Sequence, residues 1–185
     1  AFGESALASN TTADYNTAVG KNALYANTEG TGNTGVGYTT LLANTTGSYN
    51  QAFGYGALYA NTTGTENAAF GIYSNEDNTT GSYNSSFGGY SLSNNTTASN
   101  NTAMGYKALY LNTTGSLNVA VGFQALIANT TATENTGVGY NAGQSITTGD
   151  DNTCIGIHAG ASTTYITTGR FNTCLGAHAH TSAAG

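Results

Sequence analysis

A glycine recurs every 17 residues along almost the whole of this 185-residue chain. Ten glycines from Gly3 to Gly156 are one period apart, and Gly176 closes the series after an insertion of three residues. The chain is therefore about eleven copies of one unit, close to Asn-Thr-Ala-Val-Gly-x-x-Ala-Leu-x-x-Asn-Thr-Thr-Gly-Ser-x. Such a short, strict period is typical of a solenoid, in which each unit contacts only its neighbours. Because the chain begins in the middle of a unit, we predict one array over 1–185 that is a segment of a longer chain or filament.

Two columns of bulky apolar residues recur in the unit, one just before the glycine and one, mostly leucine, four residues after it. Two such columns, separated by glycine and small residues, favour two short strands joined by a tight bend over a helical period. We therefore predict an all-β, parallel β-solenoid with 17-residue coils stacked about 4.8 Å apart. The expected buried core is the column before the glycine: Val19, Val36, Phe53, Phe70, Phe87, Met104, Val121, Val138, Ile155 and Leu175.

Two asparagine columns run through the repeats, one opening each unit and one following the leucine column by three residues. Asparagine tolerates turn conformations, and its amide can bond both the backbone and the copy in the next coil. The second column also forms Asn-Thr-Thr sequons, which are N-glycosylation acceptors if the source is a eukaryote. A glycan and a hydrogen-bonded turn ladder are thus both open at six positions: Asn44, Asn61, Asn78, Asn95, Asn112 and Asn129.

Tyrosines form further columns, for example Tyr38 and Tyr55 after the glycine and Tyr25 and Tyr59 after the leucine. An aromatic ladder exposed on a monomer would be a large apolar patch, which favours lateral association of chains through these columns. The alternative is an exposed stripe that is present because aromatic residues suit strands.

The block Asn16-Thr17-Ala18-Val19-Gly20-x-x-Ala23-Leu24 resembles the head repeat of YadA-type trimeric autotransporter adhesins. With tyrosine after the glycine and Asn-Thr-Thr-Gly closing the unit, the repeat is also similar to those of tail-fibre-domain proteins. The resemblance implies a trimeric, left-handed parallel β-roll used for surface attachment. The period of 17 residues is longer than that of the adhesin heads.

Charge and composition exclude several classes of function. Charged residues are 6% of the chain, and the only Lys and Arg are Lys21, Lys107 and Arg170, which is too few to bind a nucleic acid backbone. No apolar run reaches the roughly 20 residues that span a bilayer, so we expect no membrane insertion. Since no carboxylate, cysteine or histidine recurs with the fold, we expect no enzyme. The low charge favours an extracellular location or the surface of a cell or virion.

Two clusters near the C-terminus are candidate sites. His178 and His180 form a His-x-His pair, with His158 one coil earlier, and the tail fibres that the repeat resembles use such a pair for iron. The alternative is a pair of surface histidines and no cofactor. Cys154 and Cys174 share a column in adjacent coils, within disulfide range, although small residues filling an alanine column would look the same.

These observations lead to three expected functions. The first is a structural fibre or adhesin segment whose partners are copies of itself, as a trimer or end-to-end filament, and a host surface or glycan receptor. The second is a glycosylated extracellular filament. The third is an ice-binding protein that presents flat Thr-x-Thr ladders, as in Thr46-Gly47-Ser48 and Thr63-Gly64-Thr65, although a central glycine equally suits a polar turn.

Overall fold

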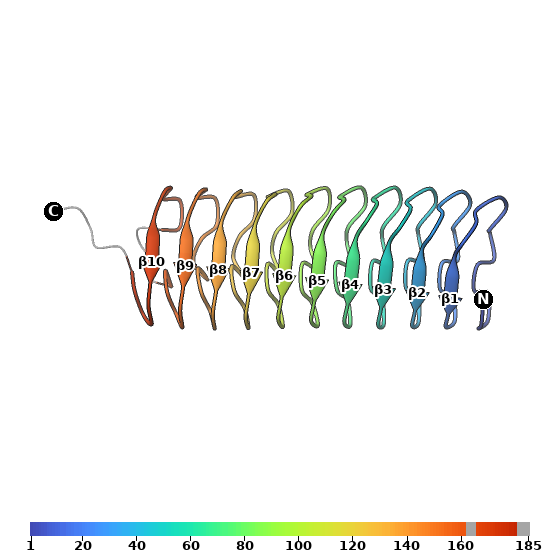
Figure 1. Cartoon of the computed structure of the whole chain (residues 1–185), viewed down its shortest axis with the longest axis horizontal. Coiled ribbons are helices and arrows are strands. Elements are labelled where there is room, and N and C mark those ends of the chain that lie inside the picture. Colours follow the sequence, from blue (N-terminus) through green and yellow to red (C-terminus); the bar gives the residue numbers. More distant parts are fainter. Residues whose placement is uncertain (162–165, 181–185) are drawn as a thin grey trace.

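The computed structural model, which describes residues 1–161 and 166–180, is a rod with one turn of chain per repeat (Figure 1). It confirms the predicted all-β parallel solenoid: the described residues form strands and turns with no helix. Each strand is three residues long, and the strands follow one another along the rod from the N-terminal to the C-terminal end. They are β1 (Thr17–Val19), β2 (Thr34–Val36), β3 (Gln51–Phe53), β4 (Ala68–Phe70), β5 (Ser85–Phe87), β6 (Thr102–Met104), β7 (Val119–Val121), β8 (Thr136–Val138), β9 (Thr153–Ile155) and β10 (Thr173–Leu175).

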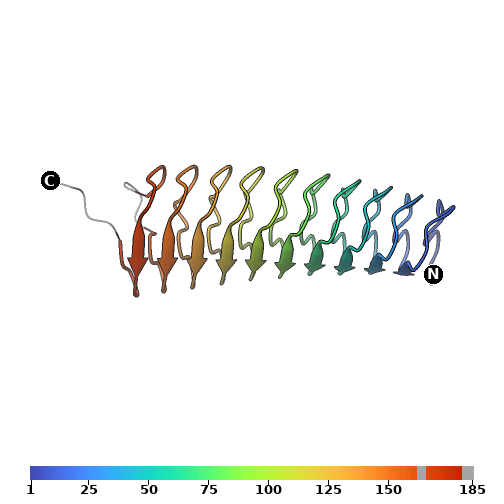
Figure 2. The same ribbon diagram turned by 45° about the horizontal axis from the view of Figure 1, so that its top comes forward.

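The strands make one ten-stranded parallel sheet in chain order, β1 to β10. Each residue pairs with its equivalent one repeat later, as Ala18 does with Gly35. The register survives the three-residue insertion, since Cys154 still pairs with Cys174. Phe2 extends the ladder by a single bridge to Val19. Turned by 45°, the strands form a row along one face of the rod (Figure 2).

The predicted core column is wrong, because only the middle residue of each strand faces inward. Successive side chains of a strand point to opposite faces, and the burial along each strand follows this alternation. The narrow coil leaves room inside the sheet for a small residue such as Ala18 or Ala52, both at most 1% exposed. The bulky third residues therefore lie outside. Among them Val19, Phe87, Met104, Ile155 and Leu175 are exposed, and Val36, Phe53, Phe70, Val121 and Val138 are half-buried.

The apolar interior consists of the leucine column and two columns of small residues. Leu24 and Leu58 are fully buried, together with alanines such as Ala23 and Ala57. These leucines adopt the left-handed backbone region, with φ of 54° at Leu24 and 52° at Leu58. That conformation costs a non-glycine residue about 1–2 kcal/mol. Burial of the leucine side chain contributes about 1.5–3 kcal/mol, which is enough to offset it.

The breaks in the leucine column have a conformational basis. Asn75, Gly143 and Gly160 replace leucine there, and all three also have positive φ, which asparagine and glycine tolerate best. At Gly143 the missing volume is filled from the asparagine column, where Ile146 is fully buried. A Cβ at Gly143 would lie 2.6 Å from Leu126 Cδ2 and 3.2 Å from Ile146 Cδ1. Glycine is therefore required where isoleucine enters the core.

A polar cluster interrupts the apolar core near its middle. The buried apolar residues form one group from Ala18 to Ala69 and a second from Leu92 to Cys174. Between them Ser74 Oγ lies 2.8 Å from Ser86 Oγ and 3.0 Å from Ser91 Oγ. Asn75 is fully buried beside them, and neither of its amide atoms has a hydrogen-bond partner.

Candidate functional site

The outer sheet face is the first candidate surface, and we define it as the first and third residues of β1 to β10. Its third residues form the bulky column, in which the Phe53, Phe70 and Phe87 rings stack with centroids 4.7 and 4.8 Å apart. Its first residues are mostly threonine, at Thr17, Thr34, Thr102, Thr136, Thr153 and Thr173, with Gln51, Ala68, Ser85 and Val119 in the remaining strands. No charged residue occurs in either column.

An aromatic ladder runs beside the glycine column and is the second candidate surface. Its rings come from two adjacent positions: where Ile72 and Gly89 follow the glycine, the next residues, Tyr73 and Tyr90, supply the ring. Gly56 makes room for this change of column, since a Cβ there would lie 2.7 Å from Tyr73 Cδ1. Neighbouring centroids are 5.0–6.0 Å apart along Tyr38, Tyr55, Tyr73, Tyr90, Tyr106, Phe123, Tyr140, His158 and His178.

Some side chains of the ladder already have polar or charged partners within the chain. A hydrogen bond with Tyr55, followed by desolvation, raises the pKa of Tyr73 to about 12. Lys107 Nζ lies 5.0 Å from the Tyr110 ring and 5.6 Å from the Tyr106 ring. Some contacts along the ladder are stacked, as between Phe123 and Tyr140, and others are edge-on, as between Tyr55 and Tyr73. Rings such as Tyr55 and Tyr140 remain exposed to solvent.

The second asparagine column is a buried hydrogen-bond ladder. Asn44 Nδ2 donates to Asn27 Oδ1 at 2.7 Å and to the Gly47 carbonyl at 2.9 Å, and the same pair of bonds recurs at Asn61. A glycan replaces one of the two hydrogens on Nδ2, so at least one of these bonds would be lost, and a sugar could not fit at a fully buried position. Of the two alternatives that the sequence left open, the structure contains the hydrogen-bonded ladder and has no room for a glycan, since all six side chains are fully buried: Asn44, Asn61, Asn78, Asn95, Asn112 and Asn129.

The first asparagine column forms an equivalent ladder beside the second, since Asn33 Nδ2 and Asn44 Nδ2 both donate to the Gly47 carbonyl. The Asn50 backbone N–H donates to Asn33 Oδ1 at 2.9 Å, while Asn50 Nδ2 donates to the Gly64 carbonyl at 2.8 Å. Each amide therefore joins its own coil to the coil on either side. Both ladders contribute to stability, and along the middle of the rod their own amides are bonded to neighbouring coils and not available to a ligand.

The Thr-Gly-Ser segments are polar turns and not the extended Thr-x-Thr array that ice binding would use there. Gly47 is buried in a corner of the coil, where a Cβ would lie 2.5 Å from Asn44 Oδ1. The Ser48 hydroxyl accepts the Thr31 backbone N–H at 3.0 Å. The Thr45 hydroxyl donates to the Thr62 carbonyl at 3.1 Å. Within Thr46-Gly47-Ser48, Thr46 is exposed while Ser48 is half-buried. The hydroxyl groups of these segments therefore do not form two parallel exposed rows on a flat surface.

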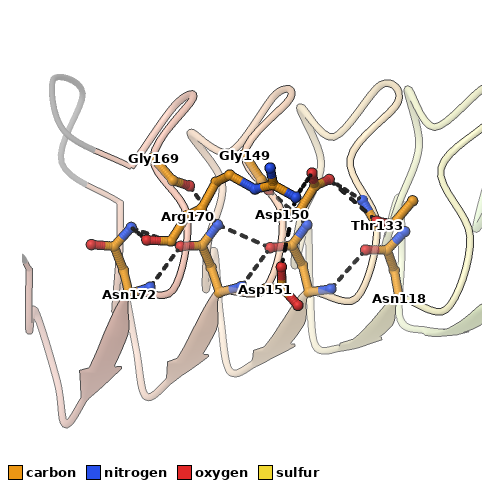
Figure 3. A network of polar contacts seen from close by, with 10 residues as sticks. Asn118, Thr133, Gly149, Asp150, Asp151, Gly169, Arg170 and Asn172 are labelled. Atoms are coloured by element: carbon orange, nitrogen blue, oxygen red, sulfur yellow. Dashed lines mark hydrogen bonds and ion pairs between the residues drawn. The ribbon is translucent and has the colours of Figure 1, made fainter.

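An ion-pair network replaces this turn pattern near the C-terminal end (Figure 3). Arg170 Nη2 lies 2.8 Å from Asp150 Oδ2 and 3.8 Å from Asp151 Oδ2. Asp150 Oδ1 accepts the Thr133 backbone N–H at 2.8 Å, the bond that serine hydroxyls accept in earlier coils. The hydrogen bond and like charge of Asp151 raise the pKa of Glu134. Arg170 thus ties the coil after the insertion to the coil before it.

The three C-terminal histidines lie close together at the surface of the rod. The His158 and His178 rings are stacked, with centroids 5.2 Å apart and planes 19° apart. His180 Nδ1 lies 3.1 Å from the His178 carbonyl oxygen. All three line one surface hollow together with Ala161. Over residues 1–161 and 166–180, no three His, Cys, Asp or Glu side chains are placed to hold a metal ion.

Cys154 and Cys174 lie side by side in β9 and β10, as their shared column predicts. Both are free thiols and both are buried, so the predicted disulfide is not formed in the structure. Burial, followed by the nearby Cys174 thiol, raises the pKa of Cys154 to about 12. A protonated, inaccessible thiol is a poor nucleophile.

Comparison of the chain with protein-family models, with curated proteins and with solved structures gave no match. The likeness to adhesin heads and tail-fibre repeats therefore remains an expectation from the sequence. In the part of the chain that the structure describes, no helix is long and apolar enough to cross a membrane.

Proposed function

We propose that this array is a structural, non-enzymatic segment of an extracellular fibre or adhesin, and that it functions by assembling with copies of itself. The observation that supports this most directly is the outer sheet face, which carries only uncharged side chains at the outward positions of ten successive strands. A regular rod with such a face suits a scaffold that sets spacing and presents a surface many times over.

The interior of the rod supports the same function. The asparagine ladders and the leucine column join each coil to the next. Most buried side chains of the repeat therefore stabilise the stack of coils itself. The test is electron microscopy of the purified chain together with sedimentation velocity over a range of concentrations. We expect elongated particles that associate as concentration rises. A monomer that never associates, even at high concentration, would contradict the proposal.

Ice binding is a second candidate, supported by a different surface from the one predicted. The first residues of the strands place threonines in register about 4.8 Å apart along the outer sheet face, as between Thr17 and Thr34 or Thr136 and Thr153. The row is broken in its middle by Gln51, Ala68 and Ser85, which weakens any match to a lattice. A measurement of thermal hysteresis separates this candidate from the first, since a fibre segment has no reason to depress the freezing point.

A further inference from the structure

We propose that the outer sheet face is the contact surface for a second copy of this chain, with the two sheets packed face to face. This inference rests on the proposed assembly and identifies which surface performs it. It also moves the interface away from the tyrosine columns that the sequence favoured.

The first argument is the apolar area that the monomer leaves in water. The exposed fractions of third-residue side chains are 38% at Val19, 38% at Phe87 and 44% at Met104. The column continues through all ten strands, so the stripe is about 45 Å long at the spacing of stacked strands. Contiguous apolar patches of this extent on a soluble protein mark an interaction surface.

The second argument is charge. The chain has nine acidic and three basic residues and a net charge of −6, yet none of the twenty outward positions of the face is charged. The surfaces of monomeric domains usually carry many charged residues, which oppose association of copies. Two copies of an acidic chain repel each other, and this uncharged face is where they can approach without placing like charges together.

The third argument is periodicity, and it selects a second copy over another partner. Contacts along a stripe of ten coils stay in register only if the partner has the same coil spacing. Consider a two-fold axis that lies between the two faces and parallel to the long axis of the rods. It places each strand opposite the same strand of the other copy, and the two strands run in opposite directions. The bulky third residue then lies over the first residue, so that Phe70 meets Ala68 and Phe87 meets Ser85.

The size of the face agrees with a specific interface. Ten strands with two outward residues each give twenty side chains, and stable interfaces use roughly 20–30 residues on each side. The aromatic ladder is a weaker candidate, because charged side chains lie against it: Lys107 Nζ is 5.6 Å from the Tyr106 ring, and Lys21 follows the glycine in the coil before Tyr38.

The test compares two triple variants of equal charge. Gln51→Lys, Ser85→Lys and Val119→Lys place lysines on the outer sheet face, two coils apart. Thr46→Lys, Thr80→Lys and Thr114→Lys place them with the same spacing at exposed turn positions. Each set changes the net charge from −6 to −3, since three neutral residues become lysine. Circular dichroism and thermal melting check that both variants fold.

Sedimentation velocity then measures the dissociation constant of each protein. We expect the face variant to dissociate at least 100-fold more readily than wild type, and the turn variant to differ by less than threefold. If the face variant associates as wild type does, this inference is overturned while the proposed fibre function stands. If wild type is monomeric at every concentration, both are overturned. Thermal hysteresis that is present in wild type and lost in the face variant would assign the face to ice and overturn the inference.

A second measurement avoids added charge, in case the lysines prevent folding. In a Cys154→Ala, Cys174→Ala background, a spin label is attached through Val119→Cys on the face or Thr114→Cys on the turn. Because packed sheets lie about 10 Å apart, we expect a short distance between labels of two copies at position 119. Short distances at position 114 and none at position 119 would contradict face-to-face packing.

Discussion

Ile146 occupies the position one coil after Asn129 and leaves Asn129 Oδ1 without a hydrogen-bond donor. In earlier coils the equivalent oxygen accepts from the next asparagine, as Asn112 Oδ1 does from Asn129 Nδ2 at 2.9 Å. The ladder therefore ends at Asn129 with one buried, unpaired acceptor. The compensation lies in the core, where Ile146 fills the volume that leucine fills elsewhere and Gly143 gives it room.

This exchange predicts strong coupling between Gly143 and Ile146. Gly143→Leu alone should destabilise by about 1–3 kcal/mol through overpacking. Ile146→Asn alone should cost about 2–4 kcal/mol, because a buried apolar side chain is lost. The double variant restores the pattern of the middle coils, so we expect it to lie within about 1 kcal/mol of wild type. Urea unfolding of the four proteins measures the coupling, and simple additivity of the two losses would show that the positions are independent.

Asn75 is the clearest site at which this chain can be stabilised. Both of its amide atoms are buried without partners, while Leu58 and Leu92 occupy the same position in the neighbouring coils. Asn75→Leu removes the desolvation cost of about 1–3 kcal/mol and adds apolar burial, although leucine is less suited to the positive φ. We expect a net gain of about 1–2 kcal/mol in the free energy of unfolding. As a control, Leu58→Asn should lose stability, and a destabilised Asn75→Leu would mean that the serine cluster requires the amide.

The buried thiol of Cys154 makes the stability of the fold depend on pH in the alkaline range. The pKa of Cys154 rises from its ordinary value of 9.0 to about 12 on folding, so the folded state holds the thiol proton more tightly. That contribution is fully present below pH 9 and is lost as pH rises toward 12. Cys154→Ala should flatten this part of the pH profile, because alanine does not titrate. The variant should still fold, since Ala52 fills the equivalent buried position in β3.

Alkylation tests the same cysteines independently. At pH 8 the folded protein should react with iodoacetamide far more slowly than the unfolded chain, because both thiols are buried. A mass two hydrogens lower after mild oxidation would instead reveal the Cys154–Cys174 disulfide that the sequence predicts. Fast alkylation in the folded state would contradict their burial.

The period and the strand register could be predicted from the sequence because both depend on spacing alone. The glycine column and the small residue before the bulky one recur without exception, and Ala18 pairs with Gly35 as the 17-residue repeat requires. The spacing changes at the three-residue insertion, but the strand register is kept there too, because Cys154 and Cys174 have equivalent flanking residues.

The side of the sheet on which each column lies could not be predicted in the same way. A two-residue alternation is compatible with either face, and hydrophobicity assigned the interior to the bulky residue, such as Val19, in place of the small one, such as Ala18. The coil is too narrow for Phe70 inside the sheet. In the sequence, Gly143 interrupts the leucine column and Ile146 interrupts the second asparagine column. Neither substitution alone indicates that the two residues share one volume in the core.

The contrast between Leu58 and Phe70 is the sharpest test of this assignment. Leu58 is fully buried, so Leu58→Ala should destabilise the monomer by about 2–5 kcal/mol. Phe70 is half-buried on the outer sheet face and stacks on Phe53 and Phe87, so Phe70→Ala should cost only about 1–2 kcal/mol in stacking and partial burial. Unfolding at low protein concentration measures both without a contribution from association. If Phe70→Ala costs as much as Leu58→Ala there, the phenylalanine column is part of the core and the outer sheet face is not free to bind a second copy.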